Sequence, residues 1–430
     1  MYTLSWSYIK EKWTHAGFQK YFRNTGWMLT ARATSFLTSF LTVAMVARYL
    51  GPENLGRLDY AQSFVAIISV FASLGIDQIL YRDLIHNPDK ENELLGTAIF
   101  SKLIFGSLAF IVSILISFLI GDDLILTLLI GICAFSFIVS PFGTVAILFN
   151  AQVKAKYSSQ VSIFLSFFIP ALKILIIFFN KGIIYFAFII LIEAIISTLC
   201  YLYIYTVYFR GKFFLWKLNI NIFSELMKGS WPLLLAGFSG YVYAKIDQVL
   251  LMHYINSTTV GIYGVAVKLT QIWAFIPGLI IGSMFPAIIN AKKINFHLYA
   301  KRFRALAGFT VGITTLIAFP LYIFAPTIIN IIFGQAYISA SPILRIYLWT
   351  SIVITLVLLV QQYFIAENLT KIFLYTSVIG AVANVLLNII LIPLYGPEGS
   401  AWGTMLSYFM AVISLFLFKK SRDGIIKIFI

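Results

Sequence analysis

The stretch GTAIFSKLIFGSLAFIVSILISFLI (96–120), followed by Gly-Asp-Asp and then by LILTLLIGICAFSFIVSPFGTVAILF (124–149), decides the fold class of this chain. Both runs are almost entirely apolar, and an α-helix needs about 20 such residues to cross the hydrocarbon core of a bilayer. Inside the bilayer a helix satisfies its own backbone hydrogen bonds, so helices are the expected spanning elements. Similar runs recur from residue 27 to residue 418, which predicts an all-α polytopic membrane protein.

The pattern predicts twelve transmembrane helices. Their approximate ranges are 27–49, 59–81, 96–120, 124–149, 161–179, 183–208, 230–254, 261–289, 305–325, 342–365, 372–394 and 399–418.

Composition excludes an ordinary soluble domain, because 60% of the residues are hydrophobic and only 11% are charged. The net charge of +15 does not indicate nucleic-acid binding here, since Lys and Arg are retained on the cytoplasmic side of membrane proteins. Cys133 and Cys200 both lie in apolar runs, so no disulfide is expected. The four histidines lack ligand spacing, and we expect neither a metal nor a cofactor.

The cations alternate along the chain. They gather in residues 1–26, 209–229 and 419–430, whereas the predicted loops 255–260 and 326–341 contain no Lys or Arg. The positive-inside rule then places both termini in the cytoplasm. Residues 1–26 lack the apolar core of a signal peptide, and they are either an interfacial helix or a disordered leader.

An internal repeat divides the chain. ARYLGPENLGRLDYAQS (47–63) aligns without gaps to MHYINSTTVGIYGVAVK (252–268), so that Gly56 meets Gly261. Six predicted spans separate the two copies, which predicts two parallel six-helix halves. The halves are 27–208 and 230–418, joined by the basic linker 209–229 and followed by the basic tail 419–430.

Charged residues also lie inside the predicted spans, where each costs several kcal/mol unless it faces a partner or a watery cavity. Lys268 is the deepest cation and has no evident acid nearby. The cations outnumber the acids, so we expect a cationic cavity that binds an anion such as phosphate or pyrophosphate. The cations are Arg32, Lys173, Lys245, Lys268 and Arg345, and the acids are Glu193 and Asp247.

Other roles remain open for several of these residues. Arg32 and Arg345 either face the cavity or extend to the headgroups, and the shallow Lys102 is set aside. Lys173 either binds the substrate or pairs with Glu193. Lys245 and Asp247 either pair or, because they are two residues apart on a helix, point to separate partners.

Three stretches together resemble the lipid-carrier flippases of the Wzx, or O-antigen translocase, type in the multidrug/oligosaccharidyl-lipid/polysaccharide exporter superfamily. They are residues 47–77, 241–271 and 366–408. The resemblance implies two six-helix bundles that form a V around a central cavity and work by alternating access. It implies a substrate that is an oligosaccharide repeat unit linked to undecaprenyl pyrophosphate, moved from the cytoplasmic to the outer leaflet.

The resemblance also suggests roles and partners. Lys245, Lys268 and Arg32, together with Lys173 and Arg345, would hold the substrate, while Glu193 or Asp247 would couple transport to a proton or sodium gradient. The expected location is the bacterial inner membrane. The expected partners are membrane lipids, a polysaccharide polymerase and a chain-length regulator, as for O-antigen in lipopolysaccharide biosynthesis.

Three alternatives compete with this interpretation. A multidrug exporter of the same superfamily often carries organic cations, which the excess of Lys and Arg disfavours. A flippase for the peptidoglycan precursor tends to have more than twelve spans. A membrane-embedded glycan polymerase or ligase usually needs a large outer loop, and the sequence contains no HExxH or P-loop motif, so an enzyme is not expected.

Overall fold

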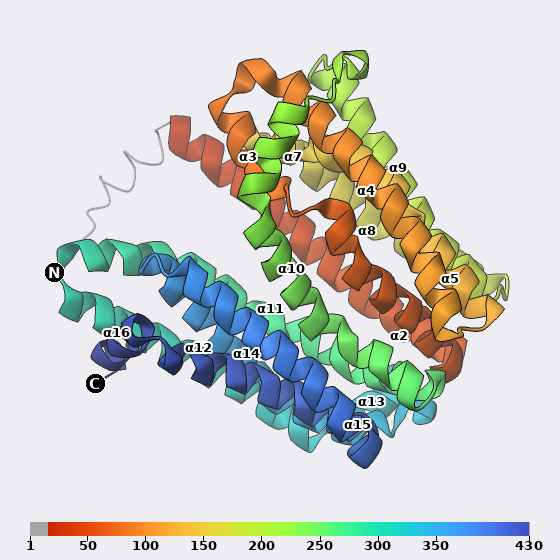
Figure 1. The fold of residues 1–430 in the computed structure, drawn as a ribbon. Helices are drawn as coiled ribbons and strands as arrows, with labels where there is room; N and C mark the ends of the chain where they lie inside the picture. The colour runs from red at the N-terminus through yellow and green to blue at the C-terminus, as the bar shows by residue number, and fades with distance from the viewer. Residues whose placement is uncertain (1–15, 430) are drawn as a thin grey trace. The chain divides into compact units, whose positions relative to one another are not determined.

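The structure is a computed structural model that describes residues 16–429, apart from the side chains of residues 16–22, 272, 274, 275 and 370. Most of the predicted N-terminal segment therefore lies outside the described residues, and residues 16–26 form the start of the first helix. The described part of the chain is helical and has no β-strand (Figure 1). This confirms the predicted all-α class.

The chain forms two compact units. The first contains residues up to Val43 together with Ile68–Leu234, and the second contains Ala44–Ile67 together with Leu235–Ile430. The helical hairpin of α2 is thus shared, because its middle portion belongs to the second unit. α10 likewise begins in the first unit and ends in the second.

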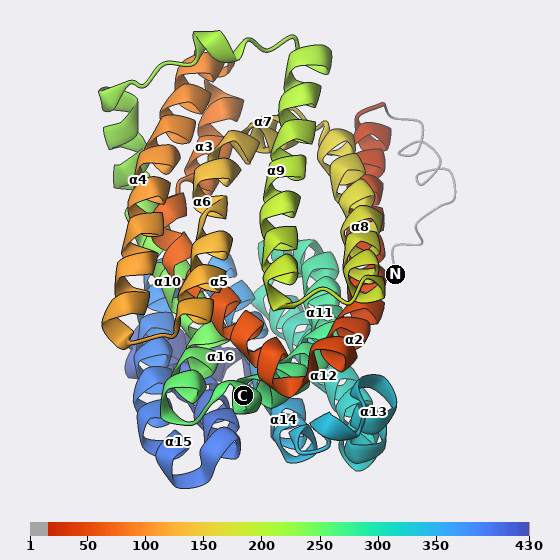
Figure 2. The same cartoon turned by 90° about the vertical axis from the view of Figure 1, so that its right-hand side faces the viewer.

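In the first unit α5 and α6 pack between α4 and α9, α7 packs on α3, and α8 packs on α9 (Figure 2). Its core includes Leu80, Leu95, Phe149 and Tyr205. The elements up to the unit boundary are α2 (Ala16–Ser73), α3 (Asp77–His86), η1 (Pro88–Lys90), α4 (Glu91–Ile120), α5 (Leu124–Ala134), α6 (Ser136–Val139), η2 (Ser140–Thr144), α7 (Val145–Ala151), α8 (Ala155–Phe178), α9 (Ile183–Tyr208), η3 (Phe213–Leu215) and α10 (Ile220–Tyr254).

In the second unit α14 packs against α11, α12 and α15, and α16 packs on α12. The remaining elements are α11 (Ser257–Ile294), α12 (Phe296–Ile323), α13 (Ala325–Phe333), η4 (Gln335–Tyr337), α14 (Ala340–Ala366), α15 (Thr370–Ser414), η5 (Leu415–Leu417) and α16 (Lys419–Phe429). The segment expected as a basic tail is therefore a helix, α16, with Ser421 and Ile428 buried.

Within the described residues, nine helices are long and apolar enough to cross a membrane, so the chain is a multi-pass membrane protein. Two of the nine contain two predicted spans each, because Gly51 breaks α2 and Gly396 breaks α15. With α10, which is not among the nine, these helices account for all twelve predicted ranges. Both glycines have positive φ, 70° and 61°, and both precede a proline that starts the next helical segment.

Two predicted ranges have features that the sequence did not predict. The expected span 124–149 is one candidate span, Leu124–Ala151, but it consists of α5, α6, η2 and α7, because Pro141 and Gly143 lie in a short 3₁₀ segment. The second half of the expected linker, residues 220–229, is already part of α10.

The aligned glycines of the repeat meet in the second unit. A Cβ atom on Gly56 would lie 1.7 Å from the carbonyl oxygen of Ser257, and a Cβ on Gly261 would lie 2.0 Å from that of Pro52. The repeat aligns Gly56 with Gly261 and Pro52 with Ser257, so each contact is the counterpart of the other. Reciprocal contacts of this kind are the signature of a two-fold relation between two similar elements. α2 and α11 approach so closely because neither glycine has a side chain.

We expect Gly56→Val to lower the free energy of unfolding by about 3 kcal/mol, because the obstructing atoms are backbone and cannot move aside. The measurement is the apparent melting temperature of the detergent-solubilised protein. Gly308→Ala is the matched control, since no atom lies within 4 Å of its added Cβ. Equal melting temperatures for both variants would contradict the close approach.

Candidate functional site

Asp247 of α10 is the most enclosed acid of the second unit, with 2% of its surface exposed. Oδ2 accepts hydrogen bonds from the hydroxyls of Tyr263 (2.5 Å), Thr404 (2.7 Å) and Tyr347 (3.0 Å). Oδ1 accepts one from the Asn388 amide at 3.2 Å. Donors from α11, α14 and α15 therefore converge on one carboxyl group, which satisfies the requirement that a buried charge be bonded.

A second layer of polar groups surrounds this carboxyl. Ser400 donates to the Asn388 side-chain oxygen at 2.6 Å, and the Asn384 amide nitrogen bonds to Thr404 (3.3 Å) and Ser407 (3.1 Å). The side-chain oxygen of Asn384 is buried and has no partner among the described residues. The spacings of four along α15 bring these residues onto common helix faces. We call this group, Asp247 with Tyr263, Tyr347, Asn384, Asn388, Ser400 and Thr404, the Asp247 cluster.

The Asp247 cluster has the chemistry of a small-cation site. All of its side chains carry oxygen atoms, the ligand type that hard cations prefer, and one of these oxygens is unpartnered. A proton on the carboxyl group is the other way to neutralise the same charge.

Lys268 of α11 forms an ion pair with Asp59 of α2, in which Nζ lies 2.6 Å from both carboxylate oxygens. Asp59 is 5% exposed at its side chain and Lys268 is 28% exposed. The expectation that Lys268 has no acid nearby is therefore wrong. Asp59 lies at the very start of the predicted span 59–81, so it is not among the buried acids expected from the sequence. The repeat could have indicated this contact, because it aligns Asp59 with Gly264, which is one helical turn before Lys268.

Lys245 of α10 is half-buried and makes no hydrogen bond or ion pair with any described residue. It interacts electrostatically with Asp59, Lys268 and Asp247. The choice between a pair with Asp247 and separate partners therefore stays a prediction. Two acids and two lysines make this group electroneutral when all are ionised, so the second unit lacks the expected excess of buried cations here.

The first unit contains three of the predicted residues, namely Arg32, Lys173 and Glu193. Glu193 of α9 interacts electrostatically with Lys173 of α8, which is the pairing that the sequence left open. Arg32 of α2 is exposed. Lys102, set aside as shallow, is buried and bonds to both Asp77 and Thr144.

Arg345 of α14 lies apart from the Asp247 cluster, because it is two residues from Tyr347 and points elsewhere. Its Nε donates to the Tyr322 carbonyl at 3.2 Å, and its guanidinium lies 5.4 Å from the centre of the Tyr322 ring. It lines a pocket with Trp349 and Trp402.

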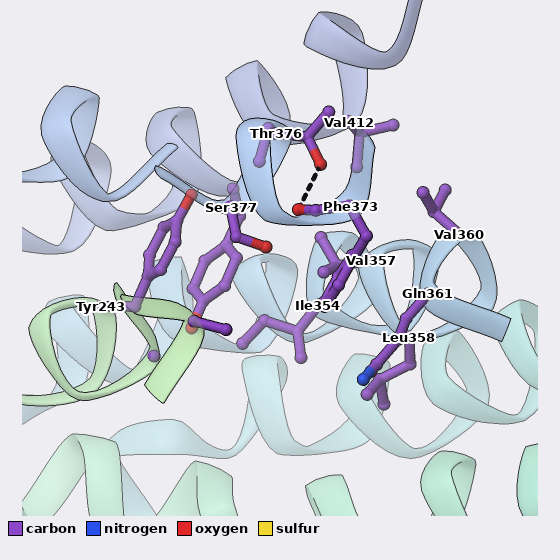
Figure 3. A pocket seen from close by; sticks show the side chains of 14 residues that line it. Tyr243, Ile354, Val357, Leu358, Val360, Gln361, Phe373, Thr376, Ser377 and Val412 are labelled. Atoms are coloured by element: carbon purple, nitrogen blue, oxygen red, sulfur yellow. Dashed lines mark hydrogen bonds between the residues drawn. The ribbon is translucent and has the colours of Figure 1, made fainter. Parts of the chain in front are cut away.

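A pocket of about 310 Å³ lies between α10, α14 and α15 (Figure 3). Tyr243 and Tyr408 stack there with ring centroids 4.5 Å apart and planes inclined by 14°. Tyr243 precedes Asp247 by four residues, and Tyr408 follows Thr404 by four, so this pocket begins one helical turn from the Asp247 cluster. The remaining lining is largely apolar, with Gln361, Thr376 and Ser377 as its polar side chains.

The sequence profile of the family described as "Polysaccharide biosynthesis protein" matches residues 21–292, more than half of the chain. The chain belongs to the polysaccharide biosynthesis protein family. The matched range contains Asp59, Lys245, Asp247 and Lys268, but it ends before Arg345.

The curated relatives are distant, and two of the three described here cover most of the chain. The chain is 26% identical over 432 residues to the uncharacterized membrane protein MJ1068 of Methanocaldococcus jannaschii, covering 91% of this chain and 82% of that protein. It is 24% identical over 413 residues to the capsular polysaccharide biosynthesis protein CapF of Staphylococcus aureus, covering 93% and 99%. A probable flippase, AglR of Haloferax volcanii, is 23% identical over 207 residues, covering 46% and 44%.

Solved structures share the fold. An inward-facing multidrug resistance MATE family transporter of the MOP superfamily has a TM-score of 0.72 at 15% identity, covering 92% of this chain and 94% of that one. The lipid II flippase MurJ in an inward closed conformation also has a TM-score of 0.72, at 16% identity and with 95% and 92% coverage. Together with the family match, these findings confirm the resemblance to the polysaccharide flippases of this superfamily.

The Asp59–Lys268 ion pair predicts that substitutions at these two positions have non-additive effects on the free energy of unfolding. Lys268→Gln leaves a buried carboxylate without its bonded partner, and we expect a loss of about 3 kcal/mol. Asp59→Asn combined with Lys268→Gln removes both charges and should recover most of that loss. Apparent melting temperatures of the two single variants and the double variant test this, and simple additivity of the single effects would refute a direct pair.

Proposed function

We propose that this protein translocates an oligosaccharide repeat unit linked to undecaprenyl pyrophosphate from the cytoplasmic to the outer leaflet of the plasma membrane, by alternating access. The repeat unit would belong to O-antigen or a similar surface polysaccharide. The observation that carries the proposal is the presence of Lys245 and Lys268 on the long helices α10 and α11 of a multi-pass membrane protein of the polysaccharide biosynthesis protein family.

The chemistry of the lipid carrier supports this role for the lysines. A pyrophosphate diester carries two negative charges, which ammonium groups bind as point charges. Lys245 has no bonded partner in the described part of the chain, so its ammonium group is available to a ligand. Lys268 is partly exposed, but it would have to exchange Asp59 for the ligand. Arg32, Lys173 and Arg345 remain proposed contacts to the sugar or phosphate, with Lys173 already engaged by Glu193.

We further propose that the Asp247 cluster takes the coupling ion, either a proton or sodium. Its support is the convergence of oxygen ligands on one buried carboxyl group and the unpartnered oxygen of Asn384. Glu193 is the second candidate. It is exposed at the surface of its own helix bundle and has Lys173 as a counter-charge, so it is less suited to hold a cation.

The positive-inside pattern supports cytoplasmic placement of both termini, and a pathway of this type would include a polymerase and a chain-length regulator as partners.

The proposal is tested by the sidedness of lipid-linked glycan in a strain that lacks the protein. Intact cells are labelled with an impermeant sugar-reactive probe before the lipids are extracted. Single repeat units that accumulate unlabelled, and become labelled on re-expression, support the flippase; unchanged labelling together with altered drug accumulation indicates a multidrug exporter.

In the same assay, Lys245→Gln and Lys268→Gln should each reduce outer-leaflet labelling by about tenfold, since each removes one charge-assisted contact to phosphate. Lys293→Gln is the control, because Lys293 is an exposed cation at the end of α11. Protein level in the membrane is measured for each variant by immunoblot. Full labelling with both variants normally inserted would rule out the lysine site.

For ion coupling, Asp247→Asn should abolish the dependence of transport on proton and sodium gradients in proteoliposomes loaded with the extracted lipid-linked glycan. Glu225→Gln, at an exposed acid, should leave that dependence unchanged. Glu193→Gln separates the two candidates: loss of the dependence in this variant alone would move the coupling site to the first unit.

A further inference from the structure

The lysine that we assign to the substrate is already bound to an anionic group of the protein. Both oxygens of Asp59 are 2.6 Å from the Lys268 ammonium group, and a phosphate would compete for the same charge. The same carboxylate also attracts the ammonium group of Lys245 electrostatically. Asp59 thus acts on both lysines.

The surroundings hold this carboxylate close to α11. A Cβ on Gly264 would lie 2.3 Å from Asp59 Oδ2, so the carboxylate fits only because residue 264 is a glycine. Asp59 itself is almost fully buried, whereas Lys268 keeps 28% of its side-chain surface exposed. Lys268 is therefore the more accessible partner of the pair.

We propose that Asp59 is an internal counter-ion that sets the charge specificity of the lysine site, and that a pyrophosphate displaces it from Lys268. The inference rests on the proposed function. A lipid with a single phosphate offers Lys268 one anionic group in exchange for the Asp59 carboxylate, so this exchange adds little binding free energy. A pyrophosphate offers a second anionic group, which the otherwise unbonded Lys245 can bind at the same time.

This arrangement addresses a difficulty that any cationic site in a bilayer faces. Phospholipids with a single anionic phosphodiester surround the protein and would fill an unguarded lysine pair. Because Asp59 is part of the chain, its carboxylate has a high effective concentration at Lys268. Only a ligand that carries more negative charge than one carboxylate competes well with it for Lys268. Asp59 is thus a positioning and specificity residue that acts through Lys268.

The test compares the binding of farnesyl pyrophosphate, farnesyl monophosphate and uncharged farnesol to the purified full-length protein in nanodiscs of neutral lipid. Wild type should prefer the pyrophosphate. Asp59→Asn should bind the monophosphate about tenfold more tightly and the pyrophosphate less than tenfold more tightly, so that selectivity falls. Lys268→Gln should weaken both charged ligands and leave farnesol unchanged.

A matched control is available in the first unit, where Lys102 pairs with Asp77. Asp77→Asn should leave all three affinities unchanged. Asp59→Ser provides a second, smaller replacement if Asp59→Asn lowers the yield of folded protein, and both must elute as the wild type does before affinities are compared.

Two outcomes would overturn the inference in different ways. If wild type prefers the pyrophosphate through Lys268 but folded Asp59 variants keep the same selectivity, then Asp59 is only a structural partner and the proposed function stands. If wild type binds farnesyl pyrophosphate no better than farnesol, and Lys268→Gln changes nothing, then the anion site itself fails and the inference falls with it.

Discussion

Burying a charge without a bonded partner is costly, and this constraint explains most of the polar interior of the second unit. Asp59 holds Lys268 through both carboxylate oxygens, and Asp247 receives hydrogen bonds at both of its own. Water is not available within the hydrocarbon region to satisfy these groups, so each must find a partner on another helix. The partners come from α2, α10, α11, α14 and α15, and these bonds specify which helices pack together.

The close approach of α2 and α11 makes the ion pair possible. Gly56 and Gly261 let the two backbones meet, and Gly264 leaves room for the Asp59 carboxylate one turn further along α11. Association of helices in lipid depends on packing of this kind, since apolar side chains gain little by leaving lipid for protein. The repeat that aligns these glycines is therefore visible both as a sequence pattern and as a reciprocal contact.

The two charged groups of the second unit have different properties that match different ligands. The Asp247 cluster is closed, rich in hydroxyl and amide oxygens, and centred on one acid, which suits a proton or a small cation. The Asp59–Lys268 pair is partly open and adjoins a second lysine, which suits an anion. Lys245 interacts with both acids, so it links the two groups electrostatically through one side chain.

The sequence by itself determined what depends on hydropathy, spacing and repetition. The apolar runs predicted a multi-pass helical protein because a helix of about 20 residues matches the bilayer. The offset between Asp247 and Lys245 indicated separate partners, and the motifs of residues 47–77, 241–271 and 366–408 indicated the family. These features are local, or they compare one segment with another, and need no knowledge of which helices touch.

Only the tertiary structure decided which charges meet. Asp59 and Lys268 are 209 positions apart, and no periodicity within either helix announces that they pair. The same holds for Asp247 with Asn388 and Thr404, whose approach depends on how α15 packs after its break at Gly396. The balance of buried charge, which determines what the site can bind, is a sum over such contacts. A count of charged residues within the predicted spans overestimated the buried positive charge, because it left out Asp59 at the start of the span 59–81.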